Sequence, residues 1–316
     1  MNLGLPYKGS KNTIAEDLVK CMPRGNKLLD ACCGGGAVLI AAAMSGRWEK
    51  VVGNDLNPAT IALLDAVLIH KGQIEYEHPP ICTRNDFLRS IQRIENGDFT
   101  IQDCVKKYCA SFCSDGKTYL YGEDIEEFKM TAEMMLSSSK LEDRRKFYRK
   151  LMGILFEDFS DEKLHRLYNL RKLKELEQLQ RLKRIKRLER LERLERLERL
   201  DIFNINYSEF DIVYFDIPYK ATNKYDFEFD YDRFYDLFTS LNKPAFLSEY
   251  DAPFNVVATF DKGMQFAASV GSTGKKESLE KLYFNGTMDD YKRLMGPEYR
   301  PMGEKQLDIF SDLHEL

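Results

Sequence analysis

The chain has 316 residues, 43% of them hydrophobic, and a formal net charge of −4. This length allows one large domain with an insertion, or two domains. No run approaches the roughly 20 apolar residues of a membrane span, and the first residues lack the long apolar core of a signal peptide. We therefore expect a cytoplasmic protein.

The seven cysteines and four histidines favour neither a disulfide framework nor a zinc site. The number of cysteines is odd, and no CxxC pair occurs. Cys104, Cys109 and Cys113 lie within ten residues of one another. We interpret them as a reduced, partly buried cluster and expect no metal.

Residues 6–12, PYKGSKN, place an aromatic ring, a glycine and two lysines just before a predicted helix. The first turn of a helix offers free N–H groups, and Lys8 and Lys11 add positive charge. This combination suits a carboxylate group of a ligand. An ordinary capped helix is the alternative.

Residues 27–44, KLLDACCGGGAVLIAAAM, predict a strand, a glycine turn and a helix that starts near Ala37. Gly34 and Gly36 allow the backbone to approach a ligand closely. Such a turn usually indicates a nucleotide site. A dinucleotide fingerprint is absent, because Leu39 stands at the third glycine position, and the Gly-Lys-Ser/Thr ending of a P-loop is absent too.

Residues 51–68, VVGNDLNPATIALLDAVL, repeat this design. A strand leads to Asp55, and a helix follows with Asn57 near its cap and Pro58 in its first turn. An acid at the end of a second strand suits a ribose diol. The alternative is that Asp55 only caps the helix.

The alternation of strands and helices stops at about residue 76 and resumes at about residue 200. This stretch is too long for a simple loop and predicts an inserted domain. Residues 140–150 are basic and helical in pattern. Polar and aromatic side chains nearby would either contact a nucleic acid or form the core of the insert. They are Ser111, Phe112, Tyr119 and Tyr121.

Leu or Ile recurs at every third position from Leu164 to Leu200, among residue types that favour helix. Three residues turn an α-helix by about 300°, so the apolar stripe slips backward and circles the helix. This pattern excludes a standard heptad coiled coil. We expect a long helix, and a compact stack of short turns is the alternative.

Charge is distributed unevenly along the chain. Residues 163–200 carry 14 Lys and Arg against 6 Glu, a net charge of +8 that leaves −12 for the rest. A basic arm on an acidic body fits contact with phosphates. A solvated charged helix is the alternative.

Residues 211–219, DIVYFDIPY, predict a short buried strand that ends in a carboxylate, a fixed turn and an aromatic ring. Ligands bind at the carboxyl ends of strands in open α/β sheets. The last four residues resemble the catalytic motif of amino-directed methyltransferases, (D/N/S)PP(Y/F). Ile217 replaces the first proline but retains its carbonyl, so we expect activity to survive. A plain Asp-x-Pro turn is the alternative.

The chemistry of that family explains these residue types. An exocyclic amine is a poor nucleophile, because its lone pair is delocalised into the ring. The Asp216 carboxylate and the Ile217 carbonyl would accept its N–H groups and hold it in line with a methyl donor. Pro218 restricts Ile217 and helps to aim that carbonyl, and Tyr219 offers a face for a base extruded from the duplex.

The order of the motifs resembles that of the Dam-type, alpha-group DNA adenine methyltransferases. The resemblance covers residues 1–75 and 200–285, and the insert partly. It implies S-adenosylmethionine as the cofactor, with Tyr7 and Lys11 at its methionine end and Asp30 at its amino group. The remaining implied cofactor-binding residues are Gly34 and Gly36, which make room, Asp55 at the ribose, and Asn206, where the family often has an acid, at the adenine ring.

Residues 306–310, QLDIF, follow a Pro- and Gly-containing linker. They resemble the short peptide by which bacterial enzymes bind the replication sliding clamp. Two apolar anchors and a glutamine on a tail suit binding in a groove. The expected contacts are Gln306, Leu307, Ile309 and Phe310, and an ordinary tail that packs its phenylalanine is the alternative.

These motifs predict an α/β fold: a doubly wound, Rossmann-like methyltransferase sheet with an inserted, mainly helical target-recognition domain. The expected divisions are a catalytic domain (1–75 plus 201–285), the insert (76–200) and a C-terminal tail (286–316). We expect methyl transfer to N6 of adenine in a specific DNA sequence, with base flipping, by a phage or bacterial restriction-modification or orphan methylase. The alternatives are an RNA or protein-amide N-methyltransferase, or a catalytically decayed DNA- or clamp-binding protein.

Overall fold

The structure is a computed structural model that describes residues 3–70, 82–156, 191–219, 229–261 and 279–300. Within these ranges the strands are β1 (Gly25–Asp30), β2 (Trp48–Asn54), β3 (Leu194–Glu198), β4 (Ile212–Phe215), β5 (Ala245–Glu249), β6 (Asn255–Asp261) and β7 (Leu279–Phe284). The α-helices are α1 (Ala15–Lys20), α2 (Ala37–Ser45), α3 (Pro58–Leu68), α4 (Arg84–Glu95), α5 (Ile101–Cys109), α6 (Glu123–Ser137), α7 (Leu141–Phe156), α10 (Tyr231–Ser240) and α11 (Met288–Met295).

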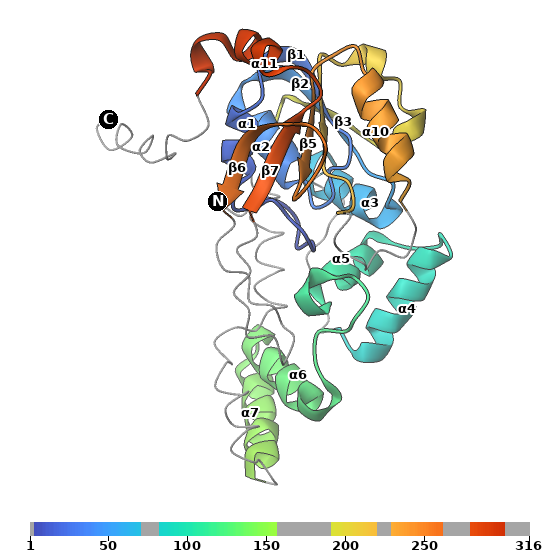
Figure 1. Cartoon of the computed structure of the whole chain (residues 1–316). Coiled ribbons are helices and arrows are strands. Elements are labelled where there is room, and N and C mark those ends of the chain that lie inside the picture. Colours follow the sequence, from blue (N-terminus) through green and yellow to red (C-terminus); the bar gives the residue numbers. More distant parts are fainter. Residues whose placement is uncertain (1–2, 71–81, 157–190, 220–228, 262–278, 301–316) are drawn as a thin grey trace, which may run out of the picture.

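The strands form one sheet in the order β3-β2-β1-β4-β5-β7-β6 (Figure 1). Parallel pairing joins β3, β2, β1, β4 and β5, whereas β7 runs antiparallel to both β5 and β6. The chain moves outward from β1 to β3 and then returns to β4, so the strand order reverses between β1 and β4. This confirms the doubly wound α/β sheet. Ligands bind at such a reversal point in open sheets.

Successive residues of the central strands alternate between two apolar layers, as the two-residue period of a strand requires. Leu28 of β1 and Ile212 of β4 face the layer formed with α1, α2, α3 and α11. Their neighbours Leu29 and Val213 face the opposite layer, which packs against α10. The sheet is therefore covered on both faces, and its carboxyl edge is where polar side chains gather.

Strand β3 corrects the sequence interpretation. The predicted long helix was expected to end at Leu200, but residues 194–198 form an edge strand parallel to β2. The Val51 amide donates to the Arg193 carbonyl at 2.7 Å. Backbone pairing along β2 outweighs the helix propensity of Leu, Glu and Arg here. The charged side chains suit an exposed sheet edge, where they discourage pairing with another chain.

The helices of residues 84–156 extend from the end of the body that carries α3 (Figure 1). The Thr60 hydroxyl of α3 and the Tyr108 hydroxyl of α5 lie 2.6 Å apart and join the two parts. Tyr119 and Tyr121 are buried in a small core with Phe87, which favours the core alternative for these two tyrosines. Ser111 is buried as well, whereas Phe112 is exposed.

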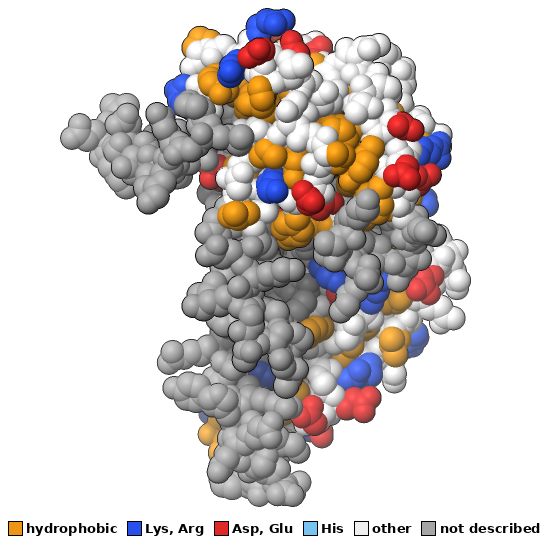
Figure 2. Space-filling model, in the orientation of Figure 1, with side chains coloured by type: hydrophobic (Ala, Val, Ile, Leu, Met, Phe, Trp, Pro, Cys, Tyr) orange, Lys and Arg blue, Asp and Glu red, His pale blue; other side chains and the backbone are white. Residues whose placement is uncertain are grey.

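On the face shown in Figure 2, Lys and Arg side chains of the described residues lie among Asp and Glu, without a large patch of one sign. Most of the leucine repeat, residues 164–190, lies outside the described residues, and so does the QLDIF peptide. The division into domains stays a prediction, although β3 adds residues before 200 to the sheet. No helix in the described part of the chain is long and apolar enough to cross a membrane.

Candidate active site

Three carboxylates follow three neighbouring strands at the carboxyl edge of the sheet. Asp30 ends β1, Asp55 follows β2, and Asp216 follows β4. The parallel pairing of these strands brings the three loops to one edge. The sequence expectation that these acids gather there is consistent with the strand order.

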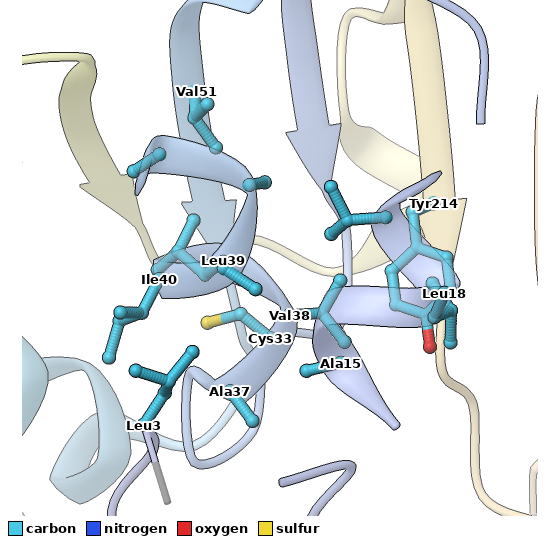
Figure 3. Close-up of a cluster of buried hydrophobic side chains, with 14 of the residues drawn as sticks. Leu3, Ala15, Leu18, Cys33, Ala37, Val38, Leu39, Ile40, Val51 and Tyr214 are labelled. Atoms are coloured by element: carbon cyan, nitrogen blue, oxygen red, sulfur yellow. The ribbon is translucent and has the colours of Figure 1, made fainter. Parts of the chain in front are cut away.

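The glycine turn between β1 and α2 is packed by the chain's own N-terminal segment. The Leu5 amide donates to the Gly35 carbonyl at 2.6 Å. A Cβ atom on Gly35 would lie 2.6 Å from the Cβ of Tyr7, and one on Gly34 would lie 3.1 Å from the Tyr7 ring. Figure 3 shows Leu3 close to Ala37 and Cys33 in the same cluster. The close approach of this segment is therefore one reason why the turn requires glycine. Tyr7 packs directly against the turn.

Asp55 connects the first two loops. Its carboxylate accepts from the Gly34 amide and from the Asn57 amide, both at 2.8 Å. The N-cap of α3 is Asn57, whose side chain accepts from the Ala59 and Thr60 amides. The alternative that Asp55 itself caps the helix is therefore wrong. Burial is the main reason why the pKa of Asp55 is raised, despite these amide donors.

Asp30 is buried, and both of its carboxylate oxygens lack a hydrogen-bond partner among the described residues. An unpaired buried carboxylate is costly. Burial, followed by the charges of Asp216 and Asp55, raises the pKa of Asp30 well above its usual value. The site therefore holds an acceptor that a cationic group would satisfy.

Lys11 joins the N-terminal segment to the D-I-P-Y motif. Its Nζ donates to both carboxylate oxygens of Asp216 at 2.5 Å and lies 3.4 Å from Oε1 of Glu280. The Lys11 side chain is only 3% exposed, and that of Glu280 is 0% exposed. Burial alone would lower the pKa of Lys11, but Asp216 and Glu280 outweigh it and raise the pKa.

Tyr219 is held within this group. Its hydroxyl donates to Glu280, the Lys11 ammonium lies 4.8 Å from its ring centroid, and Tyr250 packs edge-on at 4.7 Å. The Tyr219 side chain is buried, and burial followed by the nearby Asp216 and Glu280 charges raises its pKa.

The Ile217 side chain is buried in the apolar layer that packs against α10. The Pro218 carbonyl accepts from the Tyr231 hydroxyl at 2.9 Å.

Asn206 lies at the start of a short 3-10 helix, Tyr207–Glu209, and is exposed. Its Oδ1 accepts from the Ser208 amide at 3.2 Å and from the Ser208 hydroxyl at 2.8 Å. Its side-chain oxygen thus caps this turn. Its expected role at an adenine ring stays a prediction.

The site thus combines the Asp216 carboxylate, the Tyr219 ring and two further acids, Asp30 and Asp55, at the carboxyl edge of the sheet. Residues 7–270 match the family model described as D12 class N6 adenine-specific DNA methyltransferase. The chain belongs to this family. The match confirms the resemblance inferred from the motif order, and it identifies the protein as an adenine-specific DNA methyltransferase. A comparison with curated proteins found no match.

Two buried residues of the methyltransferase escaped the sequence analysis. Glu280 stands in LEKLYF, where the charged residues Glu280 and Lys281 interrupt an apolar strand, and this was the available signal. Asn54, next to the chosen Asp55, holds two loops through its side-chain amide. In the described part of the chain no cluster of His, Cys, Asp and Glu could hold a metal ion.

Proposed function

We propose that the enzyme transfers a methyl group from S-adenosylmethionine to N6 of an adenine flipped out of a specific DNA sequence. The observation that carries this proposal is the convergence of Asp30, Asp55 and Asp216 at the reversal point of the sheet, beside the aromatic ring of Tyr219. Family membership supplies the class of reaction.

The residues at this edge fit the cofactor. Asp30 offers an unpaired buried carboxylate that would take the α-ammonium group. Asp55 would accept from the ribose hydroxyls, although one of its oxygens already accepts from Gly34. When bound, S-adenosylmethionine supplies an electrophilic methyl group on a sulfonium. Tyr7 and Lys11, with the turn of Gly34 and Gly36, would bound the methionine end.

Asp216 and the Ile217 carbonyl would accept the two N–H groups of the adenine amine and orient its lone pair. Positive charge develops on N6 as the new bond forms, and the adjacent Asp216 carboxylate stabilises it. The extra proton then leaves N6 for solvent, so no strong general base is needed. Tyr219, held by Glu280, would contact the extruded base.

Asp30 makes cofactor binding dependent on pH. Only the ionised carboxylate pairs with an ammonium, and its pKa is raised in the free enzyme. The affinity for S-adenosylhomocysteine, which carries the same amino group, is therefore expected to rise as the pH rises through the raised pKa of Asp30 and then to level off. Asp30→Asn should flatten this dependence and weaken binding by about tenfold to a hundredfold at neutral pH.

Calorimetric titration at several pH values measures this effect. Asp211→Asn is the matched control, because Asp211 accepts from the Asn26 and Lys27 amides at the opposite end of the sheet. A pH profile of Asp30→Asn that matches the wild type would rule out Asp30 as the partner of the amino group.

Helix α7 supports contact with DNA. Its first ten residues are almost all exposed and carry five basic side chains: Arg144, Arg145, Lys146, Arg149 and Lys150. Such a helix suits phosphate contacts that do not depend on sequence. The basic stretch of residues 163–200 was expected to act in the same way, and most of it lies outside the described residues.

The decisive test is transfer of labelled methyl from S-adenosylmethionine to unmethylated DNA, with RNA and protein as parallel substrates. We expect label in DNA, recovered as N6-methyladenine after hydrolysis. Label in RNA or in a protein amide instead would support one of the two alternative substrates. Cofactor binding without transfer to any substrate would support a decayed site.

Two expectations, the sliding clamp as a partner of Gln306–Phe310 and a cytoplasmic location, stay predictions from sequence.

A further inference from the structure

The contacts of Lys11 conflict with the work proposed for Asp216. The Lys11 ammonium occupies both carboxylate oxygens of Asp216 at 2.5 Å. The same carboxylate is proposed to accept an N–H group of the target adenine. Each oxygen keeps a further lone pair, but the bound ammonium draws charge from the carboxylate and weakens it as an acceptor for the amine.

Charge makes the conflict sharper during the reaction. The lone pair of N6 forms the new C–N bond, the electron pair of the broken C–S bond leaves with sulfur, and the N6 proton then goes to solvent. N6 therefore gains positive charge beside Asp216. An ammonium still bound to Asp216 would repel that charge in a site where screening by water is weak.

A second acceptor for Lys11 is already in place. Oε1 of Glu280 lies 3.4 Å from Nζ, slightly outside the distance of a strong hydrogen bond. Glu280 comes from β7, whose antiparallel direction places its first residues at the carboxyl edge of the parallel strands. The Tyr219 hydroxyl also donates to Glu280 and fixes its position. A small shift of Nζ would bring Lys11 onto Glu280.

We propose that Glu280 is a positioning residue that receives the Lys11 ammonium when the target amine binds Asp216. This inference rests on the proposed function of Asp216. Without Glu280, Lys11 would have to leave Asp216 as an unpaired buried cation, which is costly. With Glu280, the cation keeps a partner throughout, and Tyr219 stays anchored beneath the base while Asp216 changes partners.

The kinetic test is Glu280→Gln, which keeps the size of the side chain and an acceptor for Tyr219 but removes the charge. We expect kcat to fall by about tenfold or more, with KM for DNA and the affinity for S-adenosylhomocysteine nearly unchanged. In a Lys11→Met background the same substitution should have little further effect, because no cation needs a second partner. A purely structural role of Glu280 predicts losses that multiply, and that result would overturn the proposal.

A second readout does not depend on methyl transfer. The pKa of Lys11, followed by NMR of lysine labelled at Cε, should fall in Glu280→Gln but not in Tyr219→Phe, which removes only the hydroxyl. Glu249→Gln is the matched control, because Glu249 is a buried acid at the same edge on β5. A Lys11 pKa that is equal in Glu280→Gln and the wild type contradicts the inference.

The wild-type protein gives a further test that needs no variant. In the complex with DNA and S-adenosylhomocysteine, Lys11 should stay charged with a raised pKa, because Glu280 replaces Asp216 as its partner. A pKa lowered by burial in that complex would show that no acceptor receives Lys11. Adenine methylation by the wild type with normal Glu280→Gln kinetics overturns this inference alone, whereas absence of methylation overturns the proposed function and this inference with it.

Discussion

Asp216→Ala is expected to lower kcat for methyl transfer to DNA adenine by about 1,000-fold, the scale of losing a key electrostatic group at a reacting centre. Asp216 is the carboxylate of the D-I-P-Y motif and remains 22% exposed, whereas its partner Lys11 is only 3% exposed. The substitution removes an acceptor from the amine and leaves Lys11 with Glu280 as its remaining acidic neighbour within 4 Å among the described residues. Single-turnover transfer of labelled methyl measures the loss.

The design of this experiment separates chemistry from folding. Asp216→Asn keeps a carbonyl acceptor and matches a residue found in the family motif, so kcat should fall less in this variant than in the alanine variant. Asp236→Ala, on the exposed face of α10, is the control for loss of a carboxylate. Near-normal kcat in Asp216→Ala, with the protein folded and cofactor bound, would remove Asp216 from the mechanism.

The second large effect concerns stability. Asn54 is fully buried at the end of β2, where its Nδ2 donates to the carbonyls of Ala31 and Leu200 at 2.9 and 3.0 Å. Its Oδ1 accepts from the Leu200 amide at 2.8 Å. Asn54→Ala would leave the buried Ala31 carbonyl and the partly buried backbone groups of Leu200 without this partner. We expect a loss of about 3 kcal/mol in the free energy of unfolding, at about 1–3 kcal/mol for each unsatisfied group.

Denaturant unfolding with a calorimetric check measures this loss. Asn57→Ala is the comparison, because the Asn57 side chain accepts from two amides in the first turn of α3, and loss of this cap should cost about 1 kcal/mol. A loss for Asn54→Ala no larger than for Asn57→Ala would mean that the clamp between the β1 loop and the end of β3 adds little. Weaker binding of S-adenosylhomocysteine is expected as well, since the clamped β1 loop begins next to Asp30.

The sequence predicted the parts of the fold that depend on local pattern. Apolar runs that end in Asp30, Asp55 and Asp216 predicted strands whose carboxyl ends carry the site, and β1, β2 and β4 confirm those strands. The glycine turn predicted a helix from about Ala37, where α2 begins. These features follow from backbone preferences within a few residues. The order of the motifs along the chain was sufficient to predict the family.

Contacts between distant segments needed the structure. The Leu-Glu-Arg repeat has helix-forming residues, yet residues 194–198 pair with β2, because an open sheet edge offers hydrogen bonds that local propensity does not register. From the sequence, Tyr119 and Tyr121 could either contact a nucleic acid or form the core of the insert. Their burial with Phe87 favours the core. The amino-acid composition of a segment is the same whichever structure it forms, and only its packing in the folded protein shows which structure it adopts.

The same limit applies within the site. The sequence by itself determined which residue types stand at the strand ends, because those positions follow from strand and turn patterns. Only the tertiary structure decided that Lys11, 205 positions before Asp216, donates to it, and that Glu280 from an antiparallel strand lies beside both. Ion pairs between segments so far apart depend on how the sheet closes, and no local pattern encodes that geometry.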